Sequence, residues 1–151
     1  MLKWRTKMAG VKLSQTEMQY INMLLRVVNV SVKDCIVDEE NNRVIYVVAQ
    51  GQAGLAIGRR GSNIARLKEL IAKDVEIVEY SPDMRTFIKN CFLPIVVREI
   101  KFQERRNGTI VKVKVDSKDT GRAIGRNGKN INRVKKLVTR QFDVQDVLIE
   151  Q

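Results

Sequence analysis

The sequence of 151 residues contains no histidine, which removes the commonest general base at neutral pH and the commonest protein ligand of metal ions. It contains only two cysteines, Cys35 and Cys91, which lie far apart, each among apolar neighbours. This placement is typical of reduced core cysteines rather than of a disulfide or a zinc site. We therefore expect no metal ion, no cofactor and no disulfide.

Aromatic residues are also scarce, at 5% of the chain, and long apolar runs are absent. An RNA-recognition motif, which stacks bases on the aromatic side chains of its sheet, needs a run of such residues that this sequence does not have. The basic segment 1–12 has no apolar stretch long enough for a signal peptide, and no later segment is long enough to span a membrane. We expect a cytoplasmic protein that does not contact membranes.

Positive charge is present in excess, because 28 lysines and arginines stand against 17 acidic residues, for a net charge of +11. Such an excess favours a polyanionic partner, with nucleic acid first among these. The chain has 44% apolar and 30% charged residues, which is the balance of a folded globular protein. Its carboxylates are scattered, and we interpret them as solvated charges. An enzyme, such as a small magnesium-dependent nuclease or a nucleotide transferase, is the alternative, and it would use Asp143, Asp146 or Glu150.

The sequence repeats itself at a spacing of 67 residues. The stretch GLAIGRRGSNIARLKELI, residues 54–71, matches GRAIGRNGKNINRVKKLV, residues 121–138, at eleven of eighteen positions without a gap. A repeat of this density predicts two copies of one small domain. We expect a basic N-terminal arm at residues 1–13, a first domain at residues 14–80 and a second domain at residues 81–151.

Each copy reads as a helix, two strands, two helices and a closing strand, which gives an α+β fold. The first helix is predicted to begin at a capping box formed by Ser14 and Glu17. The remaining segments expected in the first copy are strands at 32–37 and 43–49, helices at 53–57 and 62–72, and a strand at 75–79. Those expected in the second copy are a helix at 84–93, strands at 95–103 and 109–115, helices on both sides of 125–128, and a strand at 144–149.

The two predicted sheets differ on their outer faces. Ile45 and Val47 in the first copy correspond to Lys112 and Lys114 in the second, so the outer face is apolar in one sheet and charged in the other. An apolar outer face predicts a cover. The nearest apolar candidates in the sequence are Leu2, Trp4 and Met8.

In each copy a G-x-x-G loop joins the two short helices, at residues 58–61 and 125–128. The spacing of its glycines fits neither the dinucleotide fingerprint nor the mononucleotide P-loop. Glycine at both corners lets a foreign backbone approach, and the positive end of the following helix suits a phosphate, as do the arginines of the loop. The isoleucines beside the loop offer an apolar wall to bases, although they also belong in part to the core. The candidate RNA-binding residues are Ile57, Gly58, Arg59, Arg60, Gly61, Ser62, Asn63, Ile64, Ile124, Gly125, Arg126, Asn127, Gly128, Lys129, Asn130 and Ile131.

The loops and the order of the elements resemble the KH domain of type II, an RNA-binding module whose G-x-x-G loop clamps about four nucleotides. Two tandem copies joined by VEIVEYSPDMRTFIKNCFLP resemble the paired KH region of the NusA family in its short archaeal form. The resemblance implies a monomeric, non-enzymatic protein that binds single-stranded RNA and acts on nascent transcripts in elongation or termination, with RNA polymerase or other transcription factors as further partners. A ribosome-associated or ribosome-assembly KH protein is the alternative that the same loops would serve.

Overall fold

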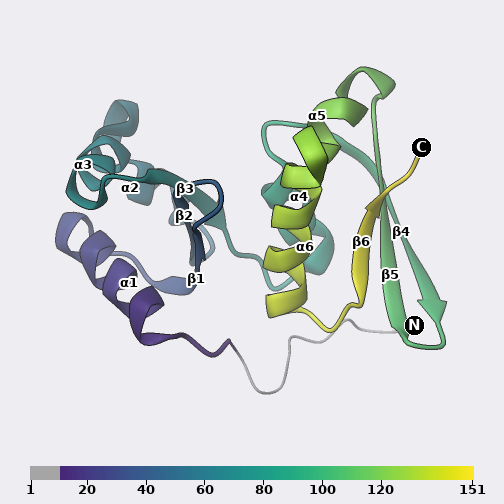
Figure 1. Cartoon of the computed structure of the whole chain (residues 1–151), viewed down its shortest axis with the longest axis horizontal. Helices are drawn as coiled ribbons and strands as arrows, with labels where there is room; N and C mark the ends of the chain where they lie inside the picture. Colours follow the sequence, from purple (N-terminus) through teal and green to yellow (C-terminus); the bar gives the residue numbers. More distant parts are fainter. Residues whose placement is uncertain (1–10) are drawn as a thin grey trace. The chain divides into compact units, whose positions relative to one another are not determined.

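The computed structural model describes residues 11–151, which form two compact units, residues 11–81 and residues 82–151. Each unit contains a three-stranded sheet with its helices on one face (Figure 1). The order α-β-β-α-α-β is present in both units, so the predicted α+β class and the repeat are confirmed. Within the described residues, no helix is both long enough and apolar enough to cross a membrane.

The first unit begins with α1 (Gln15–Val27), whose N-terminus is closed by the predicted capping box. The N–H of Glu17 donates to Ser14 Oγ at 3.1 Å, and the N–H of Ser14 donates to Glu17 Oε1 at 2.8 Å. The elements that follow are β1 (Val32–Asp38), β2 (Arg43–Val48), α2 (Ala53–Ile57), the single turn η1 (Arg59–Gly61), α3 (Ser62–Ile71) and β3 (Asp74–Glu79).

The sheet of the first unit has the order β1-β2-β3, in which β2 pairs antiparallel with β1 and parallel with β3. Tyr46 lies in its core, where burial raises the pKa of the phenol, and its hydroxyl donates to the carbonyl of Tyr20 at 2.7 Å. Ile45 and Val47 on the outer face are also buried, at 1% and 0% exposure. Leu2, Trp4 and Met8, the predicted cover, lie outside the described residues. The inner core consists of Leu24, Val30, Cys35, Val44, Tyr46, Val48, Ala56, Leu67 and Val75.

The second unit begins with α4 (Met84–Phe92), which is capped by Asp83 accepting from the N–H of Thr86 at 3.1 Å. Its first strand begins at Val97 rather than at residue 95 as predicted, and it extends to Arg105. The elements after α4 are β4 (Val97–Arg105), β5 (Gly108–Val115), η2 (Ser117–Asp119), α5 (Thr120–Ile124), the single turn η3 (Arg126–Gly128), α6 (Lys129–Gln141) and β6 (Asp146–Ile149).

The second sheet repeats the first, with the order β4-β5-β6, an antiparallel β4–β5 pair and a parallel β5–β6 pair. The predicted alternation along β5 is confirmed, because Val111, Val113 and Val115 are buried, whereas Lys112 and Lys114 are not. Cys35 and Cys91 are buried and free. The buried core includes Phe87, Ile88, Cys91, Phe92, Ala123, Val134, Leu137, Val138, Phe142 and Val147.

Both sheets contain an irregularity at the same place, near the start of their first strand. The register shifts between Val32 and Asp34 in β1, and between Val97 and Glu99 in β4. These shifts leave one residue of each first strand, Lys33 or Arg98, out of the regular pairing. A basic side chain therefore stands at the equivalent position of both units.

Candidate nucleic-acid interface

The two G-x-x-G loops have almost the same backbone conformation. Their first glycines, Gly58 and Gly125, have φ 81° with ψ 169° and 166°. Two residues further on, Arg60 and Asn127 both have φ 56°. Each loop therefore leaves the short helix, turns through the left-handed region and enters the long helix in the same way.

The first glycine of each loop occupies a backbone region that is essentially closed to residues with a Cβ. A Cβ at Gly58 would lie 2.8 Å from the backbone nitrogen of Asn63, and one at Gly125 would lie 2.7 Å from that of Asn130. Both the backbone angles and the close contact thus require glycine here, and they bring the loop close to the start of the long helix.

An asparagine near the start of each long helix fixes this arrangement. Asn63 Nδ2 donates to the carbonyl of Leu55 at 3.0 Å, and Asn130 Nδ2 donates to that of Ala123 at 2.9 Å. Both bonds join the long helix to the short helix across the loop. These asparagines, which we had included among the RNA-binding candidates, therefore have a local role in holding the loop.

The second loop has an additional support that the first does not share. Arg133 is buried, and its Nη1 donates to the carbonyl of Cys91 at 2.7 Å and lies 3.4 Å from Asn130 Oδ1. The carbonyl of Cys91 is near the C-terminal end of α4, where helix carbonyls need a partner. The corresponding residue of the first unit, Arg66, is exposed.

The cationic side chains of the loops project into solvent. Arg59, Arg60, Arg126 and Lys129 are exposed, and none of them forms an ion pair with any other of residues 11–151. The caps of α3 and α6 are glycines, which offer no capping side chain. The first N–H of each helix, that of Ser62 or Lys129, instead donates to the carbonyl of Arg59 or Arg126 in the preceding turn. The positive end of each helix and the unpaired cations beside it together suit an anion such as phosphate.

The apolar residues beside the loops are accessible to different extents. Ile57, Ile64 and Ile124 are half-buried, whereas Ile131 is only 8% exposed and belongs to the core of its unit. The first loop therefore has a larger apolar wall. Leu55, which is 55% exposed on α2, lies near it in sequence and adds to its apolar surface.

At the position of Leu55, the second unit has an arginine that we did not include among the candidates. Arg122 Nη2 is 2.7 Å from Asp119 Oδ1, and its side chain remains 67% exposed. The repeat alignment could have found it, since Leu55 and Arg122 are 67 residues apart. The surroundings of the two loops thus differ, with more apolar surface beside the first and more charge beside the second.

Arg60 has a left-handed backbone conformation that costs a residue with a Cβ about 1–2 kcal/mol, and that asparagine tolerates better. We expect Arg60→Asn, which copies Asn127, to raise the free energy of unfolding by about 0.5–1 kcal/mol. Urea titration measures this change. The reverse variant, Asn127→Arg, is the matched control and should be less stable by a similar amount. No stability change in either variant would contradict the argument.

The carboxylates of the enzymatic alternative do not gather into a site. Asp146 Oδ1 is 3.2 Å from Lys135 Nζ, Glu150 Oε1 is 3.7 Å from Lys101 Nζ, and Asp143 is exposed. Within residues 11–151, no group of three side chains is placed to hold a metal ion. Asp146 and Glu150 are half-buried and each faces a lysine, so they are ion-paired rather than solvated as we expected.

Two α-β-β-α-α-β units, each with a G-x-x-G loop between its last two helices, define a protein of two tandem type II KH domains. The family model described as KH domain matches residues 18–105, and the one described as NusA-like second KH domain matches residues 84–150. The chain belongs to the family that contains the archaeal NusA proteins.

Relatives and a solved structure cover most of the chain. The "Probable transcription termination protein NusA" of Methanocaldococcus jannaschii is 32% identical over 94% of this chain and 76% of its own length. The protein of the same name from Halococcus morrhuae is 36% identical over 91% of this chain and 96% of its own. The crystal structure of APE1850 is similar with a TM-score of 0.81 and 40% identity, covering 91% of this chain and all of that one.

Proposed function

We propose that this chain is a non-catalytic, single-stranded RNA-binding protein that acts on nascent transcripts. The observation that carries the proposal is the pair of equivalent loops, each with a glycine whose conformation and close contacts exclude a Cβ without strain, at least one exposed arginine, and a glycine cap at the start of the long helix. KH domains bind RNA through such loops. The half-buried isoleucines beside them would contact the bases.

The role in transcription rests on the relatives. The archaeal relatives carry the name "Probable transcription termination protein NusA". A relative from Rickettsia prowazekii, 32% identical over 60% of this chain but only 18% of its own length, carries "Transcription termination/antitermination protein NusA". We propose that this chain likewise acts in elongation or termination, as a cytoplasmic monomer, with RNA polymerase or another transcription factor as a further partner. The names favour this role over the ribosome-associated alternative.

Crosslinking in cells, followed by sequencing of the bound RNA, separates the two roles. A protein that acts in transcription should be enriched on nascent messages from many genes. Enrichment on ribosomal RNA alone would contradict our proposal and support the ribosome-associated alternative.

Binding to purified RNA tests the recognition itself. We expect tighter binding to an unpaired oligomer than to a hairpin stem of equal length, because an A-form duplex hides the base edges. The affinity should decrease with salt by about 0.7 log units per log of salt for each phosphate that the protein neutralises. Fluorescence anisotropy at several salt concentrations measures both effects. A flat salt response, or equal affinity for the two RNAs, would contradict a KH-type groove.

The same titration in the presence of magnesium tests the enzymatic alternative. We expect labelled RNA to remain intact while its mobility in a native gel is retarded. Shortened RNA, formed by the wild type and lost after Asp146→Asn, would instead indicate a nuclease.

A further inference from the structure

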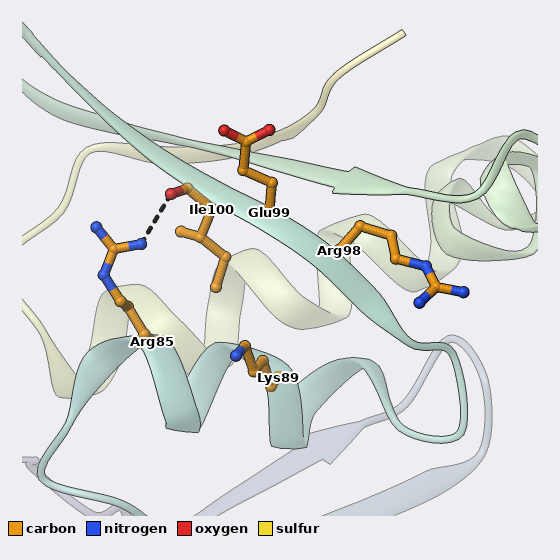
Figure 2. A pocket seen from close by; sticks show the side chains of 5 residues that line it. All are labelled: Arg85, Lys89, Arg98, Glu99 and Ile100. Carbon is orange, nitrogen blue, oxygen red and sulfur yellow. Dashed lines mark hydrogen bonds between the residues drawn. The ribbon is translucent and has the colours of Figure 1, made fainter.

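The second unit has another basic region, in a cleft between α4 and the first half of β4. Arg85, Lys89, Arg98, Glu99 and Ile100 line this cleft, which has a volume of about 360 Å³ (Figure 2). β4 is an edge strand, at the opposite edge of the sheet from β6. The cleft therefore does not include the second G-x-x-G loop.

Arg85 is held in place across the cleft. Its Nη1 donates to the carbonyl of Ile100 at 2.8 Å (Figure 2). Its guanidinium also lies over the ring of Phe102, 4.5 Å from the centroid. This bond engages one of the five donors of the guanidinium. An arginine fixed in this way loses little side-chain entropy when it binds an anion.

Lys89 lies one turn after Arg85 on the same face of α4. Both side chains are exposed, and neither is part of an ion pair within the described chain. Along the helix they are separated by about 6 Å. Two positive side chains that follow each other along one helix face suit successive phosphates of one strand better than a single small anion.

Three acidic residues lie near these two charges. The pKa of Asp83, which caps α4, is lowered by its hydrogen bond with Thr86 and also by the charges of Arg85 and Lys89. Glu99 points away from α4, to the other side of the strand (Figure 2). Its Oε1 is 3.9 Å from Lys101 Nζ. Asp116 is engaged by Arg98, with bonds of 2.9 Å and 2.8 Å to its two oxygens, and these hydrogen bonds lower its pKa. Asp83 thus offsets part of the charge of Arg85 and Lys89, but both side chains stay exposed and neither forms an ion pair within residues 11–151.

Two connections join the cleft to the region of the second loop. Asp116, the partner of Arg98, directly precedes the η2–α5 segment that leads to the loop. Cys91, two residues after Lys89, accepts a hydrogen bond from Arg133 of α6, the helix that begins where the loop ends. The cleft and the second loop are therefore connected both along the chain and through α6 within the same unit.

We propose that the cleft between α4 and β4 binds backbone phosphates of the same RNA strand, beyond the nucleotides held by the second loop. This inference rests on the proposed RNA-binding function and extends it to a second contact area. Because the contacts are to phosphate, the cleft increases affinity without reading sequence. It is reached only by RNA longer than one loop can hold.

Arg85→Gln with Lys89→Gln tests the cleft in the full chain. We expect the affinity of this double variant for a long unpaired RNA to decrease several-fold. The slope of its log affinity against log salt should become shallower by about 1.4, which is about 0.7 for each of two phosphates. The affinity of this variant for a tetranucleotide should not change.

Arg105→Gln with Arg106→Gln is the matched control, because it removes two exposed charges at the far end of β4 and in the turn that follows it. Lys89→Gln alone, which removes no hydrogen bond or ion pair seen in residues 11–151, should show about half of the change in slope without loss of stability.

The inference would be overturned if the cleft variant lost no affinity for long RNA. It would also be overturned if Arg105→Gln with Arg106→Gln lost as much affinity as the cleft variant does. A mononucleotide that binds the wild type as tightly as long RNA does, but not Lys89→Gln, would also overturn it, because the cleft would then be a small-anion site. Gly125→Ala, which alters the second loop, separates an error in the cleft assignment from an error in the proposed RNA-binding function. If this loop variant loses RNA affinity and the cleft variant does not, only the cleft assignment is wrong. If no variant changes RNA binding, the function itself is wrong.

Discussion

Replacing Arg59 and Arg60 together by aspartate should decrease the affinity for a long unpaired RNA by about 100-fold, because it removes one of two linked binding sites. In the first unit, the loop arginines are the main source of positive charge near the candidate site. Residues 1–80 have a net charge of +3, against +8 for residues 81–151. Reversing both charges leaves little in the first unit that attracts phosphate.

The matching change in the second loop should have a smaller effect. Arg126→Asp with Asn127→Asp removes one positive charge and adds two negative ones, but several basic residues remain around that loop. We expect a loss of about tenfold, because this background still attracts the RNA. The remaining basic residues with accessible side chains on or next to the helices that flank this loop include Lys118, Arg122, Lys129, Lys135 and Lys136.

Titration of a long RNA and a tetranucleotide, together with nuclease footprinting, measures both changes. Each variant should bind one tetranucleotide fewer per chain and protect a shorter stretch of the long RNA. Aspartate tolerates the left-handed conformation of residue 60, so we expect the first variant to remain folded. Arg105→Asp with Arg106→Asp controls for net charge. Unchanged affinity and footprint in both loop variants would mean that the loops are not the RNA site.

Features of the structure that depend on local sequence were predictable. The loops are encoded by glycines and by an asparagine at fixed spacing, and the repeat shows this pattern twice. Helix and strand periodicity placed α2 at its observed bounds, and the capping box at Ser14 gave the start of α1. These features depend only on residues that are close together in the sequence, so they can be predicted without knowledge of the tertiary structure.

The register of the first strand in each sheet was not predictable. Val32 pairs with Val48, and Val97 pairs with Val115, so the first strands of the two copies are offset by 65 residues and the second strands by 67. The difference arises because the turn between the first two strands is shorter in the second copy. The equivalence of Lys33 and Arg98, and with it the cleft beside β4, emerges only from the paired strands.

Burial that depends on tertiary packing was not predictable either. Leu70 is 48% exposed, whereas Leu137, at the equivalent position of the repeat, is fully buried. Periodicity gives the direction of a side chain and not how far the neighbouring elements extend over it. In the second unit, the buried rings of Phe87 and Phe142, 5.8 Å apart, belong to a core that also encloses Leu137.

Gly58→Ala and Gly125→Ala should each disrupt one loop through the backbone alone. The new Cβ would require a conformation that costs about 1–3 kcal/mol, and it would lie within 2.8 Å of a backbone nitrogen of the long helix. We expect the free energy of unfolding to decrease by about 2–3 kcal/mol in each variant. RNA binding through the altered loop should be lost, although no charge has changed.

Gly54→Ala and Gly121→Ala are the matched controls, because they make the same substitution four residues earlier in each copy. Both glycines lie in short helices, and a Cβ there would meet nothing within 4 Å. Alanine in a helix is favoured over glycine by about 0.5–1 kcal/mol, so these variants should be as stable as the wild type or more so, with unchanged RNA binding. Urea denaturation and RNA titration of the four proteins compare the two positions directly. If Gly58→Ala proved as stable and as active as Gly54→Ala, the close contact with Asn63 would not be what shapes the loop.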